Sequence, residues 1–597
     1  MSQQHSREIQ ASPDPILKPI GDALTSTLFK SDLSLLVLLL VTGLIVSNIS
    51  LPKKGILADA RFGERWEKLT AVSKAQQQIQ KGKPDGMSLA IGIYEGSNLS
   101  AKISTLLTGE MPFLPLVDVQ ESGVIAGAPN SGKSFSFFLP AIRSAIRQGK
   151  PIVVFDIKGE LAKALAAFAA IHEYEVYFFA PGQKHSGRIN LLDFMANEED
   201  SAMAEQMAIA INRNANLGGL SKTDPFFGPS GDKLARSIFM LAKGTEYPDL
   251  VMAKRLLSLS NLPNRLSLAE REGKINPFVL DSFQQFRSGE KSEKTVASIQ
   301  TTASLVFDSF TRPEFMSYLV GKSTIPLDFY GKKILFLQPD PVKGNVILPV
   351  IAAILDLFMA RNFAVPRKEG LFLFLDEFAM FFLPNVYKWV NLFRSYGLSC
   401  WLGYQNFAQV RDKYGADRAN AVFSACGTKI WFNPRDAETA EAAAKYLSDK
   451  EVISWQQSRS HGKGGRSTSA SEQRYKVPLW SAKDFSQMDK GECIVINSGF
   501  RRGKKIAIPI HTQIHISQSE QDLQKECENL WNEVIYHRLC EQMAELHLPS
   551  AELRQLLQQR ATMAEAVLPL ETEESEQPQD STVGILSDEV ENYAQWV

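Results

Sequence analysis

Residues 123–142 read GVIAGAPNSGKSFSFFLPAI, and this stretch decides how the rest of the chain is interpreted. A short apolar run, Gly123–Ala126, precedes the string GAPNSGKS, which fits the pattern G-x-x-x-x-G-K-[ST], and an apolar helical stretch follows it. Glycines let the backbone curl around a polyphosphate, and the N-terminus of a helix adds partial positive charge. The order strand, loop, helix therefore predicts a phosphate-binding loop rather than an ordinary glycine-rich turn.

The eight residues of this string are the predicted nucleotide-binding residues: Gly127, Ala128, Pro129, Asn130, Ser131, Gly132, Lys133 and Ser134. The Lys133 ammonium is expected to reach the β- and γ-phosphates, and the Ser134 hydroxyl is expected to bind a metal ion. The predicted cofactors are therefore ATP and Mg²⁺.

Further apolar runs resemble strands that are covered on both faces, because they are continuous rather than alternating. They are Ile152–Phe155, Val176–Phe179, Ile334–Leu337, Leu371–Leu375, Cys400–Gly403, Lys429–Phe432 and Cys493–Ile496. Helical stretches separate most of them. The pattern predicts an α/β fold with a mostly parallel sheet between layers of helices.

Two adjacent carboxylates, Asp376 and Glu377, follow the run Leu371–Leu375 directly. Ligands of open α/β sheets bind at the carboxyl ends of the strands, so both acids are expected to face the nucleotide. Asp376 is the predicted second metal-binding residue, and Glu377 is the predicted base that orients and deprotonates the attacking water. Because 244 positions separate Gly132 from Asp376, the nucleotide-binding sheet is expected to contain an insertion.

Two more polar residues lie near predicted strands in positions that suit a multi-subunit motor. Arg394, in FRSYGLS, could act as an arginine finger in the site of a neighbouring subunit, although a surface arginine is the plainer interpretation. Gln405 lies at the end of the run Cys400–Gly403, in LGYQN, where a side-chain amide could sense the γ-phosphate. Glu377, Arg394 and Gln405 form the predicted catalytic set.

Residues between Ala196 and Ser323 contain no strand-like run and are rich in helix formers, which predicts an inserted all-α domain. Helical patterns return after Ser517, and an acidic, disordered tail is expected to close the chain. The predicted organisation is 1–54 (N-terminal segment), 55–195 and 324–516 (the two parts of the nucleotide-binding domain), 196–323 (all-α domain), 517–570 (C-terminal helices) and 571–597 (tail).

A membrane anchor is predicted at Leu33–Leu51, which carries no charged residue and would span about 28 Å as a helix. The run is too long for the apolar core of a cleaved signal peptide, and it lacks the polar stripe of a buried helix. Basic residues cluster after it, including Lys53, Lys54 and Arg61. The positive-inside bias therefore predicts a single pass through the inner (plasma) membrane, with the C-terminal bulk in the cytoplasm.

The cysteine spacing and the charge of the chain exclude some classes of protein and favour others. The five cysteines are scattered without a CxxC pair, which argues against a disulfide framework and a zinc site. The net charge is −1, yet the chain from Glu565 onward holds nine acidic residues and no Lys or Arg, so the body is mildly basic. A basic body weakly favours a polyanionic partner.

These motifs resemble the conjugative type IV secretion coupling proteins of the TraG/TraD kind, over about 58–510. Besides the phosphate loop, the resemblance rests on FDIKGEL (155–161), RINLLDF (188–194), KTVASIQTTASLVFDSF (294–310), LFLDEF (373–378), RSYGL (394–398) and AETAEAAAKYLSD (437–449). It implies a RecA-like, membrane-tethered ATPase that assembles as a homo-hexamer, with the roles given above for Lys133, Asp376, Glu377, Arg394 and Gln405. Members usually carry two N-terminal spans, whereas one clear span is present here.

The resemblance further implies that the all-α domain meets a relaxase bound to single-stranded DNA, and that the chain delivers this cargo to components of a type IV secretion channel. The expected function is therefore ATP-driven DNA translocation. A nucleotide-switched cargo receptor that does not pump DNA is the alternative. A double-strand pump of the chromosome-segregation type is disfavoured, because a helical insertion separates the nucleotide motifs and no long linker follows the anchor.

Overall fold

The computed structural model describes residues 58–570 except 85, 93–97, 216–226, 289–292, 309–310, 341–343, 381 and 463–464. The predicted anchor, 33–51, and the predicted acidic tail, 571–597, lie outside these residues. Among the residues that are described, no helix combines the length and the apolar character that a membrane crossing requires. The anchor and the tail therefore stay predictions.

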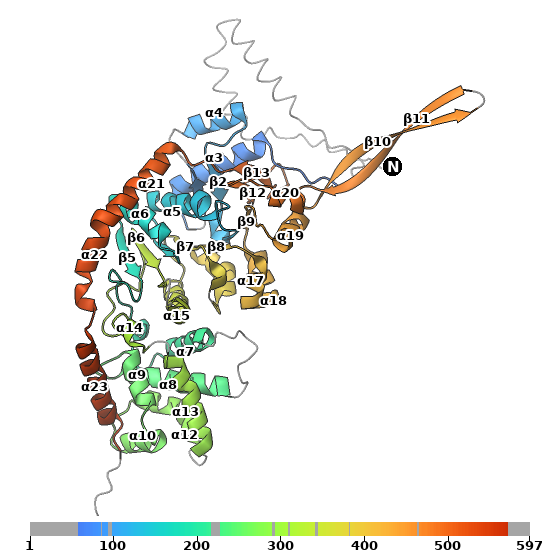
Figure 1. The fold of residues 1–597 in the computed structure, drawn as a ribbon. Coiled ribbons are helices and arrows are strands. Elements are labelled where there is room, and N and C mark those ends of the chain that lie inside the picture. Colours follow the sequence, from blue (N-terminus) through green and yellow to red (C-terminus); the bar gives the residue numbers. More distant parts are fainter. Residues whose placement is uncertain are drawn as a thin grey trace, which may run out of the picture. The chain divides into compact units, whose positions relative to one another are not determined.

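A nine-stranded sheet forms the centre of the fold, in the order β13-β12-β9-β3-β8-β7-β4-β6-β5 (Figure 1). Its strands are β3 (Gly123–Ala126), β4 (Ile152–Phe155), β5 (Glu175–Phe179), β6 (Lys333–Leu337), β7 (Leu371–Leu375), β8 (Leu398–Tyr404), β9 (Thr428–Trp431), β12 (Glu492–Ile496) and β13 (Ile510–Gln513). All eight apolar runs that predicted strands belong to this sheet. The sequence did not indicate β13, whose four residues, IHTQ, are mostly polar.

The pairing is parallel from β9 through β3, β8, β7, β4 and β6 to β5, and antiparallel only at β9–β12 and β12–β13. Successive residues of β7 belong to different apolar cores: Leu373 packs in one cluster, and Phe372 and Phe374 pack in the other. Both faces of the strand are covered, which explains its continuous apolar run. The α/β class predicted from these runs is confirmed.

Helices cover the sheet on both faces. One core contains α5 (Leu139–Arg147), α6 (Glu160–Ile171) and the start of the C-terminal helices, while the other contains α15 (Gly344–Asn362). Shorter helices follow the central strands: η3 (Leu191–Phe194), η4 (Phe378–Met380), α16 (Val386–Leu392), η5 (Phe393–Tyr396), α17 (Phe407–Tyr414), α18 (Ala416–Ala425), α19 (Ala437–Leu447) and α20 (Ala482–Ser486).

Helices are the regular secondary structure of the described part of 196–323. The helices are α7 (Ser201–Ala215), α8 (Phe227–Lys243), α9 (Leu250–Leu257), α10 (Leu262–Arg271), α11 (Pro277–Ser282), α12 (Gln284–Ser288), α13 (Glu293–Asp308) and α14 (Pro313–Met316). α7 packs against α15, so the helical block is anchored to one face of the sheet. We call 196–323 the helical block below.

The chain contains further elements outside the central sheet. The segment before the phosphate loop forms α3 (Arg65–Lys81), α4 (Asn98–Thr108), η1 (Val119–Glu121) and a two-stranded sheet of β1 (Ser88–Ile91) and β2 (Leu114–Val117). A long hairpin, β10 (Asp449–Gly462) and β11 (Gly465–Pro478), belongs to a compact unit separate from the one that holds the central sheet. The sequence interpretation of 324–516 missed this hairpin, because its strands are polar and carry no continuous apolar run.

The C-terminal helices are α21 (Gln518–Leu530), η6 (Trp531–Ile535), α22 (Tyr536–Gln542), η7 (Ala544–Leu546) and α23 (Ser550–Val567). They follow one another from the sheet to the helical block (Figure 1). α21 packs against α6, and α23 packs against α9. One continuous segment therefore contacts both the nucleotide-binding sheet and the helical block.

Candidate nucleotide-binding site

The predicted phosphate loop connects β3 to a wide helical turn, η2 (Lys133–Phe138), which continues into α5. Two positive φ angles shape it, 65° at Asn130 and 105° at Gly132. A Cβ on Gly132 would lie 2.8 Å from the backbone nitrogen of Gly491, so this position needs glycine for space as well as for conformation. The loop is packed against the chain at both ends, and its tip, Pro129 and Asn130, is exposed.

Neighbouring strand ends hold the loop in place through its backbone. The N–H of Gly127 donates to the Tyr404 carbonyl at 3.1 Å, and the N–H of Ala128 donates to the Asn433 carbonyl at 3.0 Å. The N–H of Gly491 donates to the Ser131 carbonyl at 2.9 Å. These contacts come from the ends of β8 and β9 and from the turn before β12, so the sheet fixes the position of the loop.

The acidic pair lies beside the loop, as the parallel strand order requires. Lys133 Nζ donates to the carbonyl of Asp376 at 2.8 Å and lies 3.5 Å from both Asp376 Oδ1 and Glu377 Oε2. The Ser134 hydroxyl donates to Asp376 Oδ2 at 2.5 Å. The structure thus brings together Lys133, Ser134, Asp376 and Glu377 from positions more than 240 residues apart.

Gln405 joins this group from the end of β8. Its Nε2 donates to Glu377 Oε2 at 2.7 Å, so it contacts the predicted base directly. Burial raises the pKa of Glu377, against the opposing effects of Lys133 and of the hydrogen bond from Gln405. The Glu377 carboxyl is therefore a better proton acceptor than a free glutamate, and two partners fix its orientation.

Two polar atoms of the site stay unsatisfied within the described chain. Ser131 Oγ and Asp376 Oδ1 are buried and have no hydrogen-bond partner, although Lys133 lies near the second. Buried polar atoms normally have partners, so both atoms fit a site that receives polar groups of a ligand. Asp376 Oδ1 and the Ser134 hydroxyl are hard oxygen donors of the kind that Mg²⁺ prefers, so the donor set fits that ion.

Arg394 does not belong to this cluster. It lies exposed in η5, before the first residue of β8, whereas Gln405 follows the last residue of the same strand. Seven residues of extended strand separate the two by roughly 23 Å. Arg394 therefore cannot reach the phosphate loop of its own chain, so the predicted arginine finger would have to act in the site of a neighbouring subunit.

Asp156 is a site residue whose chemistry the sequence left undefined. It follows β4, next to β7, and its Oδ2 accepts hydrogen bonds from the Ala162 N–H at 2.8 Å and from Gln338 Nε2 at 3.4 Å. Burial and the nearby charge of Asp376 raise the pKa of Asp156 from 3.8 to about 6. Lys158 and Glu160 of the same motif are exposed.

This pKa gives a testable pH dependence. In the protein without nucleotide or metal, the folded state binds a proton between about pH 4 and 6 that the unfolded state has released, so the contribution of Asp156 to stability falls as the pH rises through this window. The shift corresponds to roughly 3 kcal/mol at most. The free energy of unfolding of Asp156→Asn, measured by denaturation at pH 4 and pH 7, should lack this contribution. The same measurement on Asp417→Asn, at an exposed aspartate, should match wild type. Identical pH profiles for wild type and Asp156→Asn would contradict the assignment.

Gln338 and Asn433 were not recognised in the sequence. Gln338 directly follows β6, in ILFLQ. Asn433 directly follows Phe432, the last apolar residue of KIWFN. Gln338 contacts Asp156, and Asn433 closes the phosphate loop. The rule that singled out Asp376, a polar residue at the carboxyl end of an apolar strand, would have found both.

Close packing between β7 and β8 sets the position of Asp376. A Cβ on Gly403 would lie 2.5 Å from the Asp376 carbonyl and 2.9 Å from the ring of Phe138. Gly403→Ala should therefore destabilise the fold by about 1–3 kcal/mol and lower nucleotide affinity, because it displaces the strand end that carries Asp376. Thermal unfolding and nucleotide titration measure both effects. Gly344→Ala is the control, since its nearest atom is 3.8 Å away, and an equal response of the two variants would contradict this role of Gly403.

Comparisons with known proteins agree with these features. The protein-family model described as "TraM recognition site of TraD and TraG" matches residues 370–490, which include β7 with the acidic pair, β8 and β9. The chain is 24% identical to the conjugal transfer protein TraG of Rhizobium radiobacter over 391 residues, 63% of this chain and 60% of that protein. It is 23% identical to the coupling protein TraD of Escherichia coli (strain K12) over 474 residues, 75% of this chain and 61% of that protein. The chain thus spans about 60% of the length of these curated relatives.

Solved structures of the bacterial conjugative coupling protein TrwB share the fold. The trigonal form with sulphate aligns with a TM-score of 0.53 at 15% identity, covering 79% of this chain and 97% of that one. The complex with ADP and Mg²⁺ aligns with a TM-score of 0.51 at 16% identity, covering 67% of this chain and 87% of that one. Together with the family match and the curated relatives, this confirms the resemblance of the chain to conjugative coupling proteins of the TraG/TraD kind.

Proposed function

We propose that this chain is a membrane-anchored P-loop ATPase that moves relaxase-bound single-stranded DNA toward a type IV conjugation channel. One observation carries the enzymatic part: Lys133 and Ser134 of the phosphate loop contact the acidic pair Asp376 and Glu377. These are the side chains that phosphoryl transfer to water requires, in contact at one edge of a parallel sheet. TrwB, which shares the fold, has been solved with ADP and Mg²⁺ and with a non-hydrolysable ATP analogue.

The side chains have distinct tasks in hydrolysis. Lys133 lies 3.5 Å from both carboxylates, and on nucleotide binding its ammonium would turn to the β- and γ-phosphate oxygens. Asp376 and Ser134 would hold Mg²⁺, which neutralises the phosphate charge. Glu377, oriented by Gln405, would accept the proton of the attacking water as general base. The buried surroundings exclude bulk water and strengthen these electrostatic interactions.

The homo-hexamer implied by the resemblance is part of the proposal, and Arg394 would act in the site of a neighbouring subunit of that ring. Arg394→Ala should leave nucleotide affinity unchanged but lower turnover by about a thousandfold in the assembled protein, because an arginine finger acts in the site of a neighbour. Steady-state turnover measured at low and high protein concentration tests this. Arg554→Ala, at another exposed arginine, is the control. Full turnover of Arg394→Ala in the assembled state would make Arg394 a surface residue.

Cargo and location complete the proposal. The relatives are named for conjugal transfer and coupling, and the matched family model is described as a recognition site for TraM, so a partner of the DNA-processing complex is expected to contact 370–490. The helical block would meet the relaxase and its single-stranded DNA. The predicted anchor at 33–51 would hold the motor at the cytoplasmic face of the inner membrane, next to the channel components.

Stimulation of hydrolysis by DNA tests the motor proposal. The full chain in detergent or nanodiscs should hydrolyse ATP faster with single-stranded DNA, and the stimulation should weaken steeply with salt, because backbone phosphates dominate such binding. Hydrolysis without any response to DNA would reject the pump and favour the nucleotide-switched cargo receptor. A protein that binds no nucleotide would reject both.

A further inference from the structure

The C-terminal helices, Gln518–Val567, run from the back of the phosphate-loop helix to the helical block, and we call them the C-terminal strap. We propose that this strap transmits the nucleotide state of the phosphate loop to helices α9 and α10 of the helical block. The inference rests on the proposed function, because it requires a nucleotide at residues 127–134. Contacts along the strap carry it.

The first set joins the strap to α5, the helix that continues from the phosphate loop. Glu520 pairs with Arg143, and its other oxygen pairs with Arg147 at 2.7 Å. Arg143 is 1% exposed, and both guanidinium groups lie 5.4 Å from the ring centroid of Phe168 on α6. The Arg143–Glu520 pair of this fork is buried, while the Arg147 side chain is 41% exposed. The buried pair tolerates little displacement, because charge-assisted hydrogen bonds depend strongly on geometry. Movement of α5 must therefore carry Glu520 with it or break the pairs.

The second set lies midway and connects to the other side of the nucleotide site. The Trp531 ring packs edge-on against His185 at 5.8 Å, and His185 Nε2 lies 3.2 Å from Gln338 Oε1. Gln338 is the residue whose amide nitrogen contacts Asp156. A chain of contacts thus runs from the end of β4, beside Asp376, to the strap.

Further along, His547 fixes the strap between the sheet and the helical block. Its Nε2 lies 2.7 Å from the Lys184 carbonyl, and its Nδ1 lies 3.0 Å from the hydroxyl of Tyr318. Lys184 belongs to the loop after β5, and Tyr318 follows α14. The strap therefore changes its attachment from sheet to helices at this residue.

The third set clamps α23 onto the helical block. Arg560 donates to Asp249 Oδ2 from Nη2 at 2.9 Å and from Nε at 3.2 Å, and the two side chains are 8% and 2% exposed. The Arg560 guanidinium also lies 4.3 Å from the ring centroid of Tyr247. Asp249 caps the N-terminus of α9 by accepting from the Met252 N–H, so the clamp acts on the end of that helix. A second arginine, Arg265 of α10, donates to Glu565 Oε2 at 2.5 Å and to the Leu568 carbonyl at 2.6 Å.

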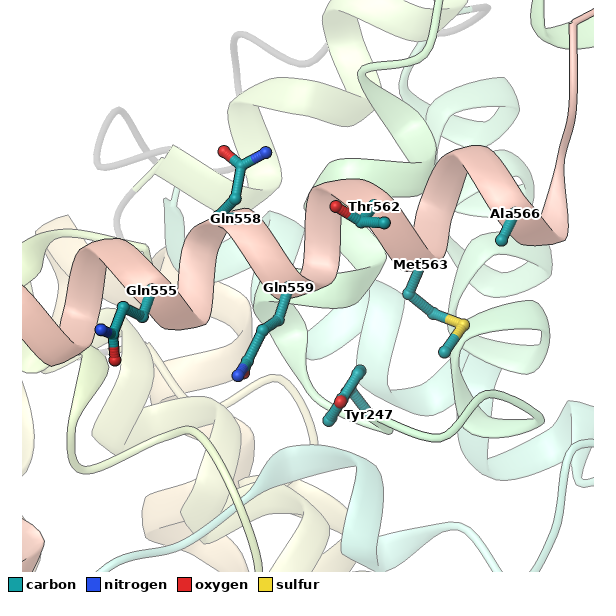
Figure 2. Close-up of a pocket in the computed structure, with 7 residues that line it drawn as sticks. All are labelled: Tyr247, Gln555, Gln558, Gln559, Thr562, Met563 and Ala566. Carbon is teal, nitrogen blue, oxygen red and sulfur yellow. The ribbon is translucent and has the colours of Figure 1, made fainter.

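A pocket lies beside α23 and the loop that carries Tyr247. Figure 2 shows it, with Tyr247 facing α23 beneath Gln559 and Met563. The groove between them is lined by Tyr247, Gln555, Gln558, Gln559, Thr562, Met563 and Ala566. Apolar packing also holds α23, since Leu556 is buried in a cluster with Val251, Met316 and Val320. The buried Arg560–Asp249 pair adds a directional attachment to this packing.

Buried charged side chains fix both ends of the strap: Arg143 with Glu520 at one end, and Asp249 with Arg560 at the other. Packed helices pass on displacement through small discrete shifts rather than by continuous bending. Because Glu520 follows α5 and Arg560 holds α9, a shift of the phosphate-loop helix is passed to the part of the chain proposed to meet cargo. Loss of either clamp should uncouple the two regions without removing the nucleotide site.

Hydrogen exchange of the full chain, with and without a non-hydrolysable ATP analogue and Mg²⁺, tests the strap. In wild type, nucleotide should slow exchange at 127–134 and also change exchange at 250–271. Arg560→Met and, separately, Glu520→Gln should keep the protection at 127–134 and lose the nucleotide-dependent change at 250–271. Arg554→Met is the matched control, since Arg554 is an exposed arginine of the same helix, and it should behave like wild type.

The measured quantity is the difference in exchange at 250–271 with and without nucleotide. General loosening of α23 in Arg560→Met would raise exchange in both states, so it does not by itself change this difference. Glu520→Gln strengthens the test, because Glu520 lies at the other end of the strap from α9. Retention of the full change at 250–271 in either variant would overturn the inference, as would a wild type that shows protection only at 127–134. Absence of protection at 127–134 in wild type would reject the proposed function and the strap inference with it.

Discussion

Lys133→Ala should lower ATP turnover by about a hundredfold to a thousandfold, while the sheet and the helical block stay folded. The Lys133 ammonium is the one cation within 3.5 Å of both Asp376 and Glu377 among the described residues, and it is 7% exposed. Its loss leaves two carboxylates next to the position of the phosphates without a compensating charge. Both the affinity for nucleotide and the stabilisation of the transition state should fall.

Nucleotide titration and steady-state hydrolysis measure this effect, and circular dichroism checks the fold. Lys274→Ala, at an exposed lysine of the helical block, should retain wild-type turnover. Turnover in Lys133→Ala comparable to that of Lys274→Ala would place the nucleotide site elsewhere in the chain.

Glu377→Gln should separate binding from chemistry. The amide keeps the shape and can still accept the hydrogen bond from Gln405, but it cannot take a proton from water, so hydrolysis should fall by about a hundredfold to ten-thousandfold. Nucleotide binding should persist or tighten, because the substitution removes a negative charge near the phosphates. If the chain is a motor, this variant should bind cargo and fail to transfer it.

Single-turnover hydrolysis and nucleotide affinity distinguish the two effects. Glu272→Gln, at an exposed glutamate, should leave both unchanged. A Glu377→Gln protein that binds nucleotide weakly and hydrolyses it at the wild-type rate would show that Glu377 supports binding rather than proton transfer.

Most of the sheet could be predicted because buried parallel strands have a distinctive sequence. Leu371–Leu375 is apolar at every position because its two faces pack in different cores, and the same holds for β3. The contact between Lys133 and Asp376 followed from the rule that parallel strands present their carboxyl ends at one edge. Local pattern therefore predicted a contact between residues that lie more than 240 positions apart.

Other features depend on tertiary partners that no local pattern records. The strands β10, β11 and β13 are mostly polar, so none of the three produced a continuous apolar run. The pairing of Arg143 with Glu520, 377 positions later, joins two ordinary amphipathic helices, and either residue alone is typical of a solvated surface. Asp156 was visible only as part of a motif, because its raised pKa comes from burial and from Asp376.

The most direct test of the central claim is an experimental structure of the full chain with a non-hydrolysable ATP analogue and Mg²⁺. We expect the triphosphate in the loop 127–134 and the metal ion between Ser134 and Asp376. The Lys133 ammonium should have turned from the Asp376 carbonyl to the β- and γ-phosphate oxygens, and the Glu377 carboxylate should face the γ-phosphate. A triphosphate bound elsewhere, with Lys133 still on the Asp376 carbonyl, would contradict the central claim.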